Sequence, residues 1–303
     1  MTELPVKKLF PALTLILIAP VLASPPGERA PINGDSLAFQ EGGEGEAILT
    51  IHGALVADAF VPILDQPALE GYQVIQYRRS GYSNSAAPDL APEDFLDRAA
   101  ADAIALLDHL DIDRAHLVGH SSGGIIAMEV ALRAPERVQS LVLLEPPTAT
   151  GPAAEALFAH VGRAGSYHED GDSAAAVDAF LTRLTGPEWE ELINERVPGA
   201  VDQAIADAGT FFDLELPGLS EFNLDEALGA QLPMPALYVL GSESSAIAGA
   251  DGFFEQSKEL LINKLPNAES ITLDGMDHSM QLGFPERLAA VVAEFVARHP
   301  VEH

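Results

Sequence analysis

The feature that most constrains this chain is the segment Gly-His-Ser-Ser-Gly at residues 119–123, which follows an apolar, strand-like run at 115–118 and precedes an apolar helical pattern. On a strand-to-helix turn of this kind the central residue has a strained backbone, which is tolerated when its flanking positions carry almost no side chain. Gly119 and Gly123 meet that condition. We therefore predict that Ser121 is a nucleophile and that the backbone N–H of Ser122 forms half of an oxyanion hole. The alternative is a glycine-rich turn with an incidental serine.

Strand-like and helical patterns alternate on both sides of this turn. Strands are expected at 36–39, 47–51, 72–77, 115–118, 138–144, 236–240 and 269–273, and residues 25–29 are expected to be a linker. The alternation predicts an α/β fold, with a mostly parallel sheet covered by helices on both faces. Ligands of such sheets bind beyond the carboxyl ends of the strands, where His52, Ser121 and Glu145 all fall.

From residue 146 to about 231 the strand pattern stops and helical apolar stripes replace it. We expect an all-helical cap or lid at 146–231, inserted into a core domain formed by 24–145 and 232–303. A lid of this kind shapes a substrate pocket, with core packing as the alternative role for each of its aromatic side chains. The pocket candidates are Leu55, Phe158, Phe180, Trp189, Phe211 and Phe212.

The composition excludes several classes of function. Forty-six acidic residues against 16 basic ones give a formal net charge of −30, which disfavours binding to nucleic acid or anionic lipid. The chain has no cysteine, so disulfides, thiolate metal sites and cysteine nucleophiles are ruled out. No spacing typical of metal ligands is visible, and we expect neither a metal nor a cofactor. The oligomeric state cannot be inferred from the sequence.

The first 23 residues have the pattern of a secretory signal. Lys7 and Lys8 precede an apolar run from Leu9 to Ala23, and the small residue Ala23 suits cleavage before Ser24. We expect a secreted or periplasmic protein with no stable membrane association after cleavage, and no fold element before about residue 36. An uncleaved membrane anchor, or a cytoplasmic enzyme with an apolar arm, is the alternative.

A His-Gly pair at positions 52 and 53 ends the strand expected at 47–51. Glycine lets the backbone approach closely there, so the N–H of Ala54 or Leu55 is available as the second oxyanion donor. His52 lies far upstream of the usual position of a base, and a structural hydrogen-bonding role is favoured for it. The remaining histidines outside the motifs are expected on solvated surfaces: His109, His116, His160, His168, His299 and His303.

Together these segments resemble the α/β-hydrolase superfamily over roughly residues 30 to 300. The matching pieces are His52-Gly53, residues 78–83, the 119–123 motif, and His278 ahead of Phe284-Pro285-Glu286. In that superfamily the catalytic order along the chain is serine, acid, histidine. The resemblance therefore implies that Ser121 is the nucleophile and that His278, on the loop after the last strand, is the base.

Two carboxylates compete for the role of the acid. Most relatives carry an aspartate after the strand expected at 236–240, and this chain has Ser244 at that position. Glu145 ends the strand that follows the nucleophile helix and precedes two prolines, an arrangement similar to that of the zearalenone lactonases. We predict Glu145 as the triad acid, with Glu243 as the alternative.

These residues favour a serine hydrolase that cleaves carboxylic esters or lactones of small apolar substrates. The histidine activates the serine, and the acid orients the histidine. One alternative is carbon–carbon bond hydrolysis or cofactor-free perhydrolysis by the same triad. Another is a non-catalytic ligand receptor with this fold, although such receptors usually lack a triad member.

Overall fold

A computed structural model describes residues 27–148, 150–220, 222–244 and 252–301. The predicted signal segment and its cleavage site lie outside these residues. Within them, no helix has both the length and the apolar character needed to cross a membrane.

The described strands form one sheet of eight, in the order β1-β2-β4-β3-β5-β6-β7-β8. The pairs β1–β2 and β2–β4 are antiparallel and all the others are parallel, so the sheet is mostly parallel, as predicted. The strands are β1 (Glu28–Ile32), β2 (Asp35–Gly42), β3 (Glu46–Ile51), β4 (Tyr72–Arg78), β5 (Ala115–His120), β6 (Val138–Leu144), β7 (Ala236–Gly241) and β8 (Ala268–Leu273).

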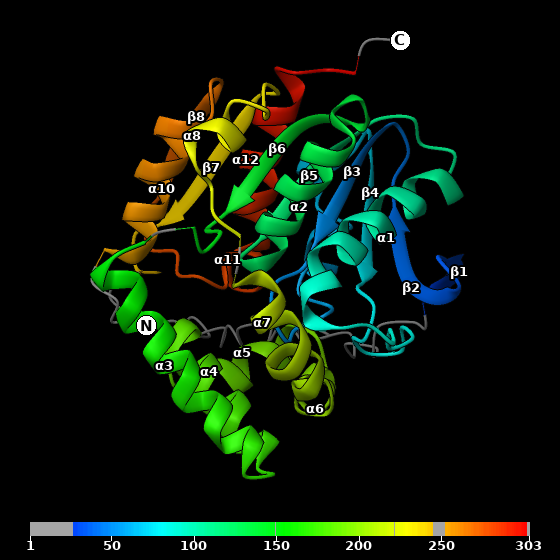
Figure 1. Ribbon diagram of the computed structural model, residues 1–303. Coiled ribbons are helices and arrows are strands. Elements are labelled where there is room, and N and C mark those ends of the chain that lie inside the picture. Colours follow the sequence, from blue (N-terminus) through cyan, green and yellow to red (C-terminus); the bar gives the residue numbers. More distant parts are fainter. Residues whose placement is uncertain (1–26, 149, 221, 245–251, 302–303) are drawn as a thin grey trace, which may run out of the picture.

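Helices cover both faces of this sheet (Figure 1). The helices of the sheet region are α1 (Phe95–His109), α2 (Ser122–Arg133), α10 (Phe253–Lys264), α11 (Met280–Gly283) and α12 (Pro285–Ala297), with short turns η1 (Val61–Ile63), η2 (Pro67–Leu69), η3 (Pro92–Asp94) and η4 (Pro135–Arg137). Helices α1, α2 and α10 pack on one face, and α12 packs with η1 and η2 on the other.

Alternating side chains divide the core into these two layers. In β5, Leu117 points to the α2 side and Val118 to the α12 side, and in β6 Leu141 and Val142 alternate in the same way. A strand buried on both faces reads as a continuous apolar run, which explains why β5 and β6 were recognisable in the sequence.

A second group of helices connects β6 to β7 and lies beyond the carboxyl ends of these strands (Figure 1). We call them the inserted helices. They are α3 (Pro152–Glu169), α4 (Ser173–Thr185), α5 (Trp189–Arg196), α6 (Ala200–Ala206), the π-helical turn η5 (Thr210–Glu215) and α7 (Leu216–Leu219). The short helix α8 (Glu226–Gly229) follows them at the other end of the sheet, where it packs against α10 near the start of β7 (Figure 1). The Asp172 side chain accepts a hydrogen bond from Ala175 N at 3.0 Å and so caps the start of α4.

Two expectations are corrected by the structure. Residues 28–32 form an edge strand, β1, where the sequence indicated a linker ahead of the fold. β1 contains Pro31, which is tolerated there because β1 is the edge strand of the sheet. His116 is fully buried in β5, with its Nδ1 2.7 Å from Ser140 Oγ, and is not a solvated surface histidine.

Candidate active site

The turn between β5 and α2 places Ser121 at the end of the sheet. Ser121 has φ +52° and ψ −124°, a conformation that few residues other than glycine adopt, and its N–H donates to Leu144 O at 2.8 Å. A Cβ on Gly119 would lie 2.5 Å from Gly123 O, and a Cβ on Gly123 would lie 2.2 Å from Ile51 O. The two glycines are therefore required by close backbone packing around the serine.

The loop after β3 passes directly beside this serine. A Cβ on Gly53 would lie 3.0 Å from Ser121 Cβ and 2.8 Å from His120 Nδ1, so only glycine permits the approach. Ala54 and Ser122 both line the cavity into which Ser121 opens. Within the described residues, the N–H groups of Ala54 and Ser122 donate to no protein acceptor. Both amides thus remain free to bind an oxyanion.

Glu145 and His278 are 133 residues apart in the chain, on the loops that follow β6 and β8 at the same edge of the sheet. Glu145 is fully buried after β6, and its Oε2 lies 2.6 Å from His278 Nδ1 while its Oε1 accepts the N–H of Gly241 at 2.7 Å. Because the carboxylate accepts, His278 carries its proton on Nδ1, and Nε2 is left with a lone pair. Glu145 has φ +49°, so the chain holds this side chain through a strained backbone.

Glu243, the alternative acid, lies elsewhere. Its side chain is exposed and accepts a hydrogen bond from Ser242 Oγ at 3.1 Å. The neighbouring Ser244, at the position where most relatives carry an aspartate, is fully buried. Of the two carboxylates, it is Glu145 that contacts His278.

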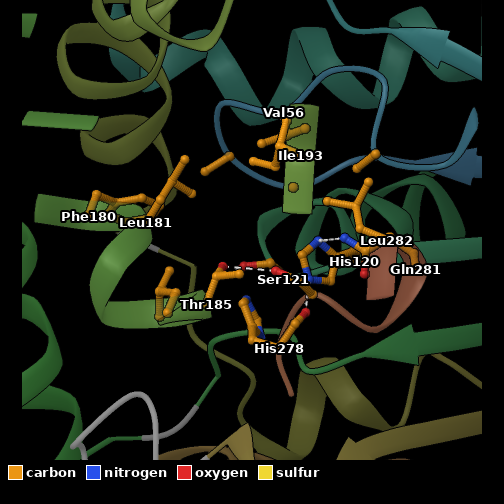
Figure 2. Close-up of a pocket in the computed structure, with 15 residues that line it drawn as sticks. Val56, His120, Ser121, Phe180, Leu181, Thr185, Ile193, His278, Gln281 and Leu282 are labelled. Atoms are coloured by element: carbon orange, nitrogen blue, oxygen red, sulfur yellow. Dashed lines mark hydrogen bonds between the residues drawn. The ribbon is translucent and has the colours of Figure 1, made fainter. Parts of the chain in front are cut away.

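Ser121 and His278 face a common space. Both line a cavity of about 870 Å³ beneath the inserted helices, and both line a smaller pocket of about 30 Å³ beside it. In Figure 2 their side chains lie next to each other, with Thr185, Phe180 and Leu181 of α4 on one side. No partner among the described residues occupies Nε2 of His278, which leaves this nitrogen available to take a proton from Ser121.

The large cavity is walled mainly by apolar side chains. Four of the six predicted pocket residues line it: Phe158, Phe180, Phe211 and Phe212. The other two do not. Leu55 is packed into the core, and Trp189 is buried with its indole N–H donating to Asp178 at 3.0 Å. Further apolar side chains of the wall are Ile125, Leu157, Val161, Leu184, Leu216, Leu219, Phe222 and Phe254.

His120, within the 119–123 motif, has a structural role that the sequence did not indicate. This buried side chain donates from Nε2 to His278 O at 2.8 Å and accepts at Nδ1 from Gln281 Nε2 at 3.2 Å. Burial, followed by the nearby His278, lowers the pKa of His120 well below its usual value, so this imidazole is neutral. Through this hydrogen bond His120 connects the loop that carries His278 to the turn that carries Ser121. In the sequence, the only sign of this role is the position of His120 directly before Ser121.

In the described ranges, histidine, aspartate and glutamate side chains nowhere gather in threes with a geometry that would hold a metal ion. The groups at this site are those of acid–base and nucleophilic chemistry: a hydroxyl, an imidazole, a buried carboxylate and free amides.

Comparison with known proteins places this geometry in context. A family model described as "Alpha/beta hydrolase family" matches residues 48–291. The chain is 28% identical over 287 residues to the dihydrolipoyllysine-residue acetyltransferase component of the acetoin cleaving system of Pseudomonas putida, covering 91% of this chain and 70% of that protein. It is 26% identical over 236 residues to the putative carbamate hydrolase RutD of Pseudomonas syringae pv. syringae, covering 76% and 85%.

Solved structures share the architecture. An enol-lactonase from Burkholderia xenovorans superimposes with a TM-score of 0.70 at 19% identity, over 89% of this chain and 100% of that one. A thermophilic esterase from Thermogutta terrifontis superimposes with a TM-score of 0.71 at 21% identity, over 90% and 100%. At these identities the likeness establishes the fold.

Proposed function

The chain belongs to the alpha/beta hydrolase family, and we propose that it is a serine hydrolase that cleaves carboxylic esters or lactones of small apolar substrates. The observation that carries the proposal is the 2.6 Å contact between Glu145 Oε2 and His278 Nδ1, on the wall of the cavity that Ser121 also lines. A buried carboxylate on one imidazole nitrogen orients the other nitrogen and stabilises the imidazolium that forms during turnover.

The proposed chemistry has two halves. In the first, Ser121 Oγ attacks the carbonyl carbon while its proton passes to Nε2 of His278, and the N–H groups of Ala54 and Ser122 bind the oxyanion. His278 then returns the proton to the leaving alcohol oxygen as the C–O bond breaks. In the second half, His278 takes a proton from water, the hydroxide attacks the acyl carbon, and the acid is released with Ser121 restored. In a lactone, the alcohol and the acid are parts of one product.

The substrate class follows from the cavity. About 870 Å³ is ample for a small molecule, and the wall is built from aliphatic and aromatic side chains with few polar groups. We propose that residues 146–231 act as the lid over this space. We also propose that Glu145, after β6, is the triad acid, an arrangement similar to that of the zearalenone lactonases. Among the relatives, a lactonase and an esterase support ester and lactone chemistry by analogy of fold.

The test is covalent labelling followed by turnover. A fluorophosphonate probe should label wild-type protein once, at Ser121, and p-nitrophenyl butyrate and a medium-ring lactone should be hydrolysed. A vinylogous diketone assayed in parallel addresses carbon–carbon hydrolysis. A correctly folded protein that the probe does not label, and that hydrolyses none of these compounds, would be a receptor, and the proposal would fail.

A further inference from the structure

A buried ion pair joins the inserted helices to the loop beside the nucleophile. Arg79, just after β4, and Glu215, at the end of η5, are 136 residues apart in the chain. Arg79 Nη2 lies 3.0 Å from both carboxylate oxygens of Glu215, and the two side chains are 3% and 0% exposed. Tyr82 also donates its hydroxyl to Glu215 and lies under the guanidinium, with Arg79 Cζ 4.7 Å from the ring centroid.

The same arginine nitrogen also contacts the loop after β3, which carries the N–H of Ala54. Arg79 Nη2 donates to Gly53 O at 2.9 Å, and His52 Nδ1 lies 2.7 Å from the same oxygen. His52 Nε2 accepts the backbone N–H of Arg79 at 3.1 Å, so the ring proton is on Nδ1 and is donated to Gly53 O. Burial, and next the charge of Arg79, lower the pKa of His52, which keeps the imidazole in this neutral form.

The oxygen that receives these two donors belongs to the peptide unit that carries the N–H of Ala54. In a planar trans peptide the C=O and N–H point in opposite directions. Holding the oxygen against Arg79 and His52 therefore turns the N–H of Ala54 away from them, towards the cavity that Ala54 and Ser121 share. Two donors on the carbonyl oxygen also polarise the peptide and strengthen its N–H as a donor.

We infer that Arg79, held by Glu215 of the inserted helices, is a positioning residue for the oxyanion hole: it fixes the Gly53–Ala54 peptide so that the N–H of Ala54 meets the developing oxyanion. This inference rests on the proposed hydrolase function. It assigns to the inserted helices a part in the chemistry besides enclosing the substrate.

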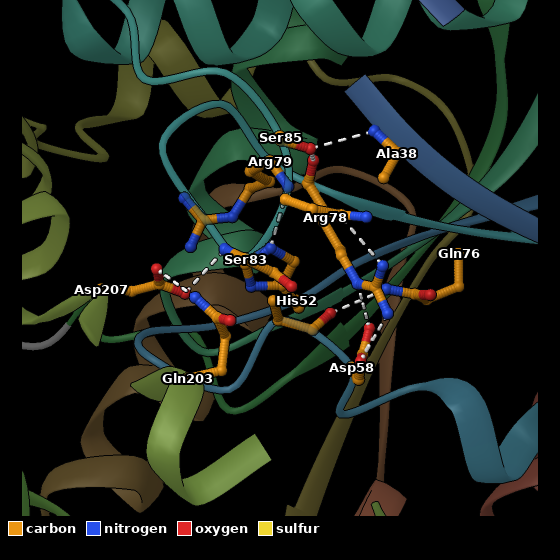
Figure 3. A network of polar contacts seen from close by, with 12 residues as sticks. Ala38, His52, Asp58, Gln76, Arg78, Arg79, Ser83, Ser85, Gln203 and Asp207 are labelled. Atoms are coloured by element: carbon orange, nitrogen blue, oxygen red, sulfur yellow. Dashed lines mark hydrogen bonds and ion pairs between the residues drawn. The ribbon is translucent and has the colours of Figure 1, made fainter. Parts of the chain in front are cut away.

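Further contacts hold the loop that carries Arg79 against the inserted helices. Thr210 Oγ1 donates to Gly81 O at 2.7 Å, and Ser83 N donates to Asp207 Oδ2 at 2.7 Å. Figure 3 shows Asp207 and Gln203 beside Ser83 at this junction. Glu215 is thus presented to Arg79 by a segment that is attached to the loop at several points.

The neighbouring arginine supplies a matched control. Arg78 forms its own ion pair with Asp58, at 2.6 Å and 2.8 Å, and the two side chains are 8% and 13% exposed. In Figure 3 the Arg78 side chain extends to Asp58, in a different direction from that of Arg79. The described contacts of Arg78 do not include Gly53 O.

The experiment compares two double variants, each of which replaces an ion pair by apolar side chains. Arg79→Met/Glu215→Leu removes the donor to Gly53 O without leaving a buried charge unpaired. We expect kcat on p-nitrophenyl butyrate to fall about tenfold to hundredfold, less than the loss of a whole oxyanion donor, with KM within about twofold. The inhibition constant of an alkyl trifluoromethyl ketone, which forms a tetrahedral adduct, should rise by a similar factor. Arg78→Met/Asp58→Leu should keep kcat within about twofold of wild type.

The outcomes separate this inference from the proposed function. An unlabelled, inactive wild-type protein overturns both. A labelled, active wild type combined with an unchanged kcat in Arg79→Met/Glu215→Leu, or with an equal loss in the control, overturns the inference alone. Should the double variant not fold, Arg79→Lys retains a charge for Glu215 but replaces the planar guanidinium, whose Nη2 contacts both Glu215 and Gly53 O, by a flexible ammonium. Its kcat should fall about threefold to tenfold at constant KM, and wild-type kcat there would equally refute the inference.

Discussion

The strand-end turns and the inserted helices enclose the same cavity but are built differently. Three non-glycine residues at the turns, Leu55, Ser121 and Glu145, have positive φ angles. In the described part of the inserted helices, every residue with positive φ is a glycine. Of the two regions, it is thus the turns that carry Ser121 and Glu145 that have a strained backbone at non-glycine residues, and the helices supply the wall. The strand-end turns hold their side chains in one geometry, whereas the inserted helices can vary in shape.

The largest loss of activity should follow a substitution at the strand-end turns. Ser121→Ala should abolish fluorophosphonate labelling and lower ester turnover to the residual level that an oxyanion hole and binding alone provide, roughly 10³-fold above the uncatalysed reaction. The lost hydroxyl faces the cavity, so the melting temperature should stay close to that of wild type. Wild-type turnover in this variant would remove the distinction between the two regions.

The next effect separates the two carboxylates. Glu145→Gln presents an amide to His278, which favours the tautomer protonated on Nε2, and that nitrogen can then no longer accept the Ser121 proton. A comparable change in a serine protease triad cost about 10⁴ in kcat, and we expect a loss of several orders of magnitude. Glu243→Gln, at the exposed site, should change kcat by less than about tenfold. Steady-state kinetics of both variants measure the difference, and the reverse order would move the acid to the loop after β7.

A smaller effect, on KM, is expected from a substitution in the inserted helices. Phe158 and Tyr167 both lie on α3 and are 50% and 49% exposed, but only Phe158 lines the cavity. Phe158→Ala should raise KM for apolar esters by about threefold to tenfold while kcat changes by less than about twofold, because binding area is lost away from the reacting atoms. Tyr167→Ala should leave both constants unchanged. A fall in kcat for Phe158→Ala would mean that the helical wall also positions the scissile bond.

The smallest effect concerns the dependence of stability on pH. Burial lowers the pKa of His52, His116 and His120 in the sheet region and of the less buried His160 in α3. Below the usual histidine pKa of about 6.5 the unfolded chain binds protons that the folded chain does not. The free energy of unfolding should therefore be constant above that pH and decrease as the pH falls towards the lowered pKa values, by at most about 1.4 kcal/mol per pH unit for each histidine.

Thermal unfolding between about pH 5 and 8 measures this decrease. His116→Gln, which removes one buried histidine away from the active site, should make it shallower. His109→Gln, at an exposed position, should not. An unchanged slope in His116→Gln would show that folding does not lower the pKa of this histidine.

The sequence predicted the features that local patterns encode. The glycines around Ser121 anticipated a turn that only glycine permits, and the apolar runs of β5 and β6 anticipated a sheet buried on both faces. Glu145 and His278 were placed by chain order and by resemblance, and the structure brings their side chains into contact.

What the sequence did not predict depends on contacts between distant segments. The 136-residue separation of Arg79 from Glu215 leaves no local pattern, and each residue alone looks like a surface charge. Trp189 was expected at the pocket because it is aromatic, but its indole is satisfied by Asp178 within the helical layer. His116 was expected at the surface. Its burial against Ser140 leaves no local pattern in the sequence, because Ser140 lies on the neighbouring strand, β6.

The Arg79–Glu215 pair also defines what can be exchanged between members of this family. The inserted helices form one continuous stretch of chain and invite replacement by those of a relative, as a way to acquire a new substrate range. Such a graft would remove Glu215 and leave the guanidinium of Arg79 buried without its counter-charge, a cost of several kcal/mol. A chimera therefore has to bring a carboxylate to the same place or replace the arginine at the same time. The unit that can be exchanged is the helical segment together with Arg79, which precedes Ser121 in the chain.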